Sequence, residues 1–186
     1  MRRAAALLLV PIAVLASVPA RADGAPAEVR LGVLWPDAGP PVGRQPGADL
    51  NAEVLSPALF GPWTALPAWL RWAASPRINL GGSLNTAGAT QQAYAGLTWT
   101  VPLATGLLHR EDGLSIGFSV GPELLGGPGV PRGLDGGPQL RLGAEIGYQV
   151  TPRLGLYVLF DHVSGGAMAH EGDSLNDVGV RVGLHF

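Results

Sequence analysis

The last eleven residues, 176–186, have the sequence NDVGVRVGLHF, and this stretch decides the fold. Apolar side chains occupy every second position from Val178 to Phe186. Glycine, arginine or histidine stands between them. A strict period of two predicts a β-strand with one apolar face and one small or polar face.

The same alternation returns along the rest of the chain. It is strong in two further segments, 114–121 and 140–149. It is weaker in four others, 29–35, 50–54, 78–84 and 93–101, and the segment 154–164 is a further strand. Together with the C-terminal segment these make eight strands, and an even number of strands is typical of closed antiparallel barrels in bacterial outer membranes.

Alternation alone does not say which face of the sheet points outward. A water-soluble barrel carrying a small apolar ligand would turn its apolar face inward, and this alternative stays open on alternation alone. The non-apolar face of this chain combines many glycines with charges of both signs: Glu28, Arg30, Glu53, Arg141, Glu145 and Arg181. An eight-stranded barrel has room inside only for side chains, so small residues and pairable charges suit its interior. We therefore predict an all-β fold, an eight-stranded antiparallel transmembrane β-barrel with its apolar face toward lipid.

The N-terminus has the layout of a secretory signal peptide. Two arginines precede a short apolar run, and a small-residue site ends at Ala22. We expect a signal peptide at 1–22 and the barrel domain at 23–186.

Removing a segment with three of the 12 basic residues leaves 9 basic against 14 acidic residues, a net charge of −5, so nucleic acid is not an expected partner. The chain has no cysteine, and we expect no cofactor and no metal site.

The connections predict how the barrel sits in the membrane. A tight turn at 151–153 contrasts with long stretches rich in proline and glycine at 36–48 and 122–136. Short turns belong on the periplasmic side and long loops outside. The connection 57–76 is an exception, because it is long and falls on the periplasmic side. Its apolar residues suggest a short amphipathic helix or interfacial anchors: Trp63, Leu66, Trp69, Leu70 and Trp72.

Two polar residues interrupt the lipid-facing row of the segment 154–164. His162 and Ser164 share the parity of its apolar residues. Polar groups on a lipid face are costly, and a spacing of two places the pair roughly 7 Å apart at their Cα atoms, within reach of a Ser/His nucleophile pair. Asn176 also faces outward, and it lies opposite His162 if Phe160 pairs with Val178. From spacing alone, two polar residues in the interfacial band remain the plainer interpretation.

The acidic neighbours of these residues have the opposite parity. Asp161 and Asp177 are expected to face the barrel interior. There the simplest expectation is pairing with Arg141 or Arg181.

The chain resembles the lipid A 3-O-deacylase family, the PagL-like outer-membrane enzymes also called acyloxyacyl hydrolases. The resemblance extends over most of the chain after residue 22 and is carried by five segments: 51–55, 76–88, 93–99, 162–164 and 176–181. In that family a His-x-Ser-Asn motif supplies base and nucleophile, and an acid fourteen residues after the His completes the triad. The His and Ser fall on His162 and Ser164, whereas Gly165 replaces the motif Asn and Asn176 replaces the acid.

The resemblance implies an outer-membrane esterase that removes the 3-O-linked hydroxyacyl chain from lipid A of lipopolysaccharide. Ser164 would attack, His162 would act as base and then acid, and Asn176 would orient the imidazole. The backbone N–H groups of Gly165 and Gly166 are candidate oxyanion donors. The alternative is a non-catalytic barrel of the same descent with a structural or lipopolysaccharide-contacting role. A homodimer is one option for its assembly.

Overall fold

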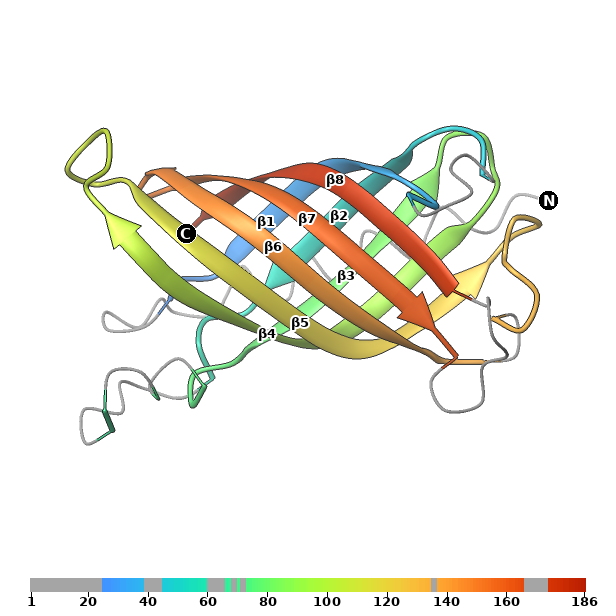
Figure 1. The fold of residues 1–186 in the computed structure, drawn as a ribbon, viewed down its shortest axis with the longest axis horizontal. Coiled ribbons are helices and arrows are strands. Elements are labelled where there is room, and N and C mark those ends of the chain that lie inside the picture. The colour runs from blue at the N-terminus through green and yellow to red at the C-terminus, as the bar shows by residue number, and fades with distance from the viewer. Residues whose placement is uncertain are drawn as a thin grey trace.

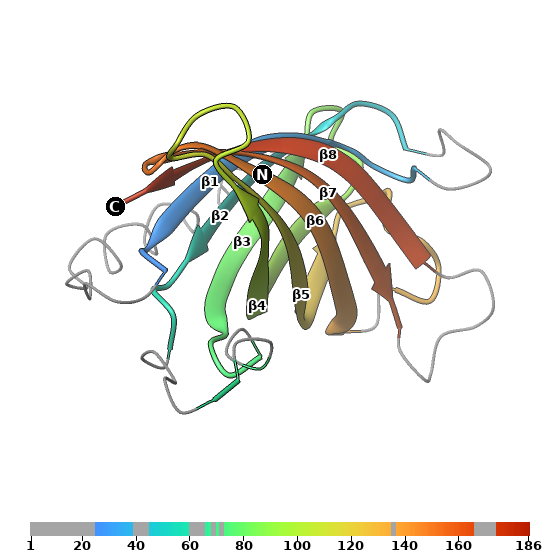
Figure 2. The same ribbon diagram turned by 60° about the vertical axis from the view of Figure 1, so that its left-hand side comes forward.

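The chain folds into a closed barrel of eight antiparallel strands, each paired with its neighbours in sequence and β1 closing against β8 (Figure 1). This computed structural model describes residues 25–38, 45–59, 66–67, 70, 73–134, 137–165 and 174–186. The segment predicted to be a signal peptide lies outside the described residues, as do Trp63, Trp69 and Trp72 of the connection 57–76. The strands run obliquely to the long axis, and a turned view shows the sheet curving round on itself (Figure 2).

Every strand expected from alternation is present, and several are longer than expected. The strands are β1 (Glu28–Trp35), β2 (Asp49–Leu55), β3 (Arg77–Asn85), β4 (Gln91–Thr105), β5 (Gly113–Gly126), β6 (Gln139–Thr151), β7 (Leu154–Ser164) and β8 (Ser174–His185). The stretch 122–126, expected in a loop, instead continues β5. Its alternation persists, because Glu123 is buried and Leu124 is 55% exposed.

The outer wall of the barrel is apolar. Along β8, Val178, Val180 and Val182 are between 37% and 49% exposed, whereas Gly179 and Arg181 between them are buried. Large exposed apolar side chains line the outward face of every strand. Such a continuous apolar surface fits hydrocarbon and not water. The water-soluble alternative is therefore wrong, and the chain is an eight-stranded transmembrane barrel of the bacterial outer membrane. In the described part of the chain, no helix has the length and apolar character needed to cross a membrane.

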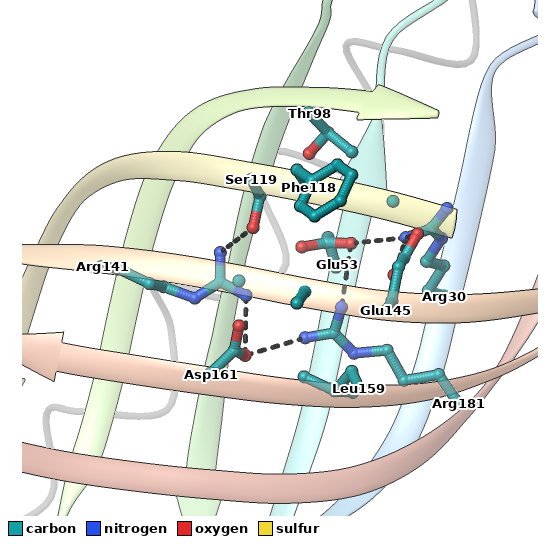
Figure 3. Close-up of a pocket in the computed structure, with 13 residues that line it drawn as sticks. Arg30, Glu53, Thr98, Phe118, Ser119, Arg141, Glu145, Leu159, Asp161 and Arg181 are labelled. Atoms are coloured by element: carbon teal, nitrogen blue, oxygen red, sulfur yellow. Dashed lines mark hydrogen bonds and ion pairs between the residues drawn. The ribbon is translucent and has the colours of Figure 1, made fainter. Parts of the chain in front are cut away.

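The interior is filled by paired charges, as expected. Arg30 lies 2.8 Å from both Glu28 and Glu145, and Arg181 lies 3.1 Å from Glu53. Arg141 lies 2.7 Å from Asp161. Figure 3 shows the three arginines and the carboxylates of Glu53, Glu145 and Asp161 pointing toward one another across the barrel. Buried charges are tolerable only when paired in this way.

Aromatic rings and glycines complete this packing. The guanidinium groups of Arg30 and Arg141 stack over the rings of Tyr157 and Tyr94, at 4.1 and 3.9 Å from the ring centroids. A Cβ atom at Gly81 would come within 2.6 Å of the Tyr94 ring. The glycines of the inner face therefore make room for the large side chains opposite.

The two inward acids differ in their partners. Asp161 pairs with Arg141 and lies 3.7 Å from Arg181, as predicted. Asp177 does not pair with either arginine. Instead its carboxylate accepts a 2.6 Å hydrogen bond from Gln92 Nε2, which reaches it from β4 on the far side of the barrel.

The connections give the barrel two different ends. We call the end with the two-residue turn 152–153 and the segment 106–112 the turn end, and the opposite end, where β5 ends at Gly126 and β7 at Ser164, the loop end. At the loop end Leu134 folds back and packs against Val163 and Leu175, and all three are at most 1% exposed. Short turns are typical of the periplasmic side, so the loop end is expected to face the cell exterior.

Candidate active site

The β7–β8 hairpin has the register that the sequence led us to expect. Phe160 pairs with Val178, and His162 pairs with Asn176. Both strands present these residues on the outer wall, near the loop end. His162 and Asn176 are half-buried.

A direct hydrogen bond joins the two polar side chains. His162 Nδ1 lies 2.7 Å from Asn176 Oδ1. Because an amide oxygen only accepts, Nδ1 carries the hydrogen and donates it. The other ring nitrogen, Nε2, then keeps its lone pair and can take a proton. Asn176 thus selects the tautomer that a general base needs.

Ser164 stands two residues beyond His162 on the same face and is half-buried. Within the described residues no hydrogen bond joins its hydroxyl to His162. Residues two apart on a strand lie about 7 Å apart at their Cα atoms, so a change of rotamer can bring Oγ toward Nε2. The structure therefore places the pair on one face and leaves Nε2 directed away from Asn176.

A fourth polar residue, Ser174, belongs to the same patch and was not predicted from the sequence. Ser174 begins β8 and pairs directly with Ser164. The four residues make a block two strands wide and two residue pairs long, which we call the polar block: His162, Ser164, Ser174 and Asn176. Ser174 shares the parity of Asn176, and this was the signal that could have revealed it.

Apolar side chains border the polar block on the β6 side. On β6, Leu140 pairs with Ser164 and Leu142 pairs with His162, and both leucines are at least 40% exposed. A groove on the outer wall begins at His162 and extends to Trp99. Ala144 lies in it between the larger rings of Phe118 and Phe160, with which it pairs. The groove is lined mainly by apolar side chains.

The polar block is supported from inside the barrel. Val163 lies between His162 and Ser164 on the inward face, and Leu175 precedes Asn176. Both pack against Leu134 of the connection between β5 and β6. The main chain of Leu134 is held in turn, because its carbonyl accepts a 3.1 Å hydrogen bond from Gln139 Nε2.

The oxyanion candidates are only partly described. Gly165 directly follows β7 and is half-buried, and Gly166 lies outside the described residues. Their role as donors therefore stays a prediction.

Within the described residues, the barrel interior leaves little free space. Its cavity, drawn in Figure 3, has a volume of about 10 Å³ and is lined by the paired arginines and carboxylates. That is room for about one water molecule. A long apolar chain therefore fits the groove on the outer wall and not this cavity.

Comparisons with known proteins support the fold but do not identify the reaction. No protein-family model matches the chain, and no curated protein sequence matches it. The crystal structure of the outer membrane enzyme PagL is similar, with a TM-score of 0.63 and 9% identity, over 86% of this chain and 99% of that one.

Two further solved barrels are less similar. Neisserial surface protein A gives a TM-score of 0.49 at 10% identity, over 86% of this chain and 97% of that one. The N-terminal barrel domain of Pseudomonas aeruginosa OprF also gives 0.49, at 9% identity, over 88% of this chain and 100% of that one. At 9% identity, the likeness to PagL concerns the fold alone, an eight-stranded outer-membrane barrel.

Proposed function

We propose that the protein is an outer-membrane esterase that removes the 3-O-linked hydroxyacyl chain from lipid A. The observation that carries the proposal is the 2.7 Å hydrogen bond from His162 Nδ1 to Asn176, on an otherwise apolar wall. It holds the imidazole in the tautomer that can accept a proton at Nε2. Ser164 is the nearest hydroxyl on the same strand and face.

The reaction proceeds in two halves. Ser164 Oγ gives its proton to His162 Nε2 and attacks the ester carbonyl carbon, which forms a tetrahedral oxyanion. The oxyanion collapses, the bond to the sugar oxygen breaks, and the imidazolium returns its proton to that oxygen. Water then attacks the acyl-serine by the same path, which releases the 3-hydroxy fatty acid and regenerates Ser164. The backbone N–H groups of Gly165 and Gly166 are the candidate donors to the oxyanion.

The surroundings of the polar block favour a lipid substrate. The groove from His162 to Trp99 lies on the membrane-facing wall, so an acyl chain can occupy it without leaving the hydrocarbon. The polar block itself lies at the loop end of that wall, where an ester near the headgroup of an outer-leaflet lipid is at the matching depth.

Purified protein with lipopolysaccharide as substrate tests the proposal. Ser164→Ala and His162→Ala should each abolish release of 3-hydroxy fatty acid. Because the two residues act as a unit, the double variant should be little worse than either single variant. Heat-modifiable migration on gels reports the folded barrel in every sample.

The matched control is Gln91→Ala, which removes a polar side chain at the loop end of β4, outside the polar block. It should leave activity unchanged. A folded wild-type protein that releases no fatty acid would favour the alternative, a non-catalytic barrel with a structural or lipopolysaccharide-contacting role.

A further inference from the structure

Ser174 has no role in the mechanism so far, although it stands directly opposite Ser164 across the ladder. We propose that the Ser174 hydroxyl donates a hydrogen bond to the oxyanion formed when Ser164 attacks. This inference rests on the proposed function. It adds a side-chain donor to the site, from the strand that faces the nucleophile.

The spacing of the two serines suits this role. Directly opposed residues in an antiparallel pair have Cβ atoms roughly 5 Å apart. An oxyanion donor has to lie about 3 Å from the oxygen that acquires the charge. A carbonyl group bonded to Ser164 Oγ can therefore place its oxygen between the two side chains, within reach of the Ser174 hydroxyl.

The other three side chains of the polar block already have roles in the proposed mechanism. His162 Nδ1 and Asn176 Oδ1 are hydrogen-bonded to each other, His162 Nε2 has to receive the proton, and Ser164 supplies the nucleophile. The neighbouring β6 residues at the same level, Leu140 and Leu142, have no polar side-chain atoms. Asn176 Nδ2 also carries N–H groups, but Asn176 lies opposite the base. Of the two residues paired directly with the nucleophile, Leu140 and Ser174, only Ser174 has a side chain that can donate.

The apolar setting makes such a donor valuable. Leucines flank the polar block on the β6 side, so few water molecules can solvate a developing negative charge. A fixed hydroxyl in a poorly hydrated site stabilises the charge more than it would in bulk water. Ser174 is half-buried, so the residue is accessible from the outer wall without being fully exposed to solvent.

Kinetics on the full-length protein with lipopolysaccharide in mixed micelles test the assignment. Ser174→Ala should lower kcat by about 100-fold, the lower range for loss of one oxyanion donor, with KM nearly unchanged. Ser174→Thr keeps the hydroxyl on a residue that suits a strand, and it should recover most of kcat. Gln91→Ala is the control and should match the wild-type protein, and heat-modifiable migration should be the same for all four proteins.

A phosphonate ester with an acyl-like chain identifies the nucleophile independently, since it labels the attacking serine covalently. Labelling of Ser164 in the wild-type protein and in Ser174→Ala agrees with the assignment. Labelling of Ser174 overturns it, and so does Ser174→Ala with wild-type kcat while Ser164→Ala is inactive. A folded wild-type protein that is neither labelled nor active overturns the proposed function itself, and this assignment with it.

Discussion

The side chain that orients His162 is neutral, so the candidate site has no negative charge beside the imidazole. Asn176 fixes the orientation and tautomer of the ring through a 2.7 Å hydrogen bond. It supplies no counter-charge when His162 becomes imidazolium. The adjacent Asp177 cannot supply one either, because its side chain is buried inside the barrel on Gln92.

Asn176→Asp adds the missing charge with almost no change in shape. The carboxylate would stand opposite Nδ1 in the place of the amide oxygen and stabilise the imidazolium formed during attack. We expect the deacylation rate to rise about tenfold, which corresponds to roughly 1.4 kcal/mol of barrier. The acid limb of the pH–rate profile should move to higher pH, because the ring must be neutral to act as a base and the carboxylate favours its charged form.

Asn176→Ala is the comparison for that variant. It removes the hydrogen bond without adding charge, so the rate should fall. A lower rate for Asn176→Asp with an intact fold would show that Asn176 is not a weakened substitute for an acid.

The sequence was sufficient to place three of the four residues of the polar block on one face. The alternation along each strand predicted that His162, Ser164 and Asn176 face outward. The assumed pairing of Phe160 with Val178 then predicted the register of the hairpin. Ser174 was missed because the alternation was followed only as far as Asn176 at the start of the last strand. The partner of Asp177 was missed because Gln92 reaches it across the barrel from 85 residues away, and alternation contains no information about contacts across the interior.

At the scale of elements, alternation located all eight strands and was weakest at their ends. β5 continues through Pro122 because its inward and outward alternation persists beyond the proline. β4 continues past Pro102, where the pairing with β5 shifts register between Pro102 and Ala104. Proline and glycine predict loops from local preference, and the closed ladder overrides that preference here.

The connection between β4 and β5 is organised by one carboxylate. Asp112 accepts hydrogen bonds from the backbone N–H groups of Leu107, Leu108 and His109, at 2.7, 2.7 and 2.9 Å. It also accepts a 2.6 Å bond from the hydroxyl of Tyr148. The Tyr148 bond and then the backbone bonds hold the pKa of Asp112 well below the ordinary carboxyl value.

Asp112→Asn should therefore lower the free energy of unfolding at neutral pH. A depressed pKa means that the wild-type contribution is complete above the ordinary carboxyl pKa and is lost only as the pH falls through the lowered value. Urea titrations of the micelle-bound barrel at several pH values measure this. The gap between wild type and variant should persist down to about pH 4 and shrink at lower pH.

Tyr148→Phe is the second arm of that experiment. It removes the largest cause of the depressed pKa and leaves the backbone bonds. The acid-induced loss should therefore be smaller than in the wild-type protein and should be complete at a higher pH, because its onset is set by the unchanged pKa of the unfolded carboxyl. An unchanged profile in both variants would contradict the role given to Asp112.

In the whole molecule, apolar, charged and polar side chains occupy different surfaces of the barrel. Its outer wall is apolar, its interior is a network of ion pairs, and its polar block lies on the wall at the loop end. The sequence predicted this inside-out arrangement from the glycines and mixed charges of one face. It could not predict that Leu134 would fold back behind the polar block, because this contact joins segments that no local pattern relates.

Arginine substitutions test the orientation of the wall. Val158 and Val180 pair with each other on the outer face, and both are about half exposed to lipid. Val158→Arg or Val180→Arg should cost about 2–4 kcal/mol of folding free energy, the cost of a charge at mid-membrane. Gln149→Arg, on the inner face near the turn end, should cost far less. Equal losses at the three positions in a refolding titration would contradict the assignment of the faces.

Lipid A from living cells tests the central claim most directly. The wild-type protein and Ser164→Ala would be produced, in equal folded amounts, in a Gram-negative host whose lipid A has a 3-O-linked hydroxyacyl chain. Mass spectrometry of that lipid A should show the loss of one hydroxyacyl chain with the wild-type protein and no loss with Ser164→Ala. Unmodified lipid A in the presence of folded wild-type barrel, or the same loss with both proteins, would contradict the account.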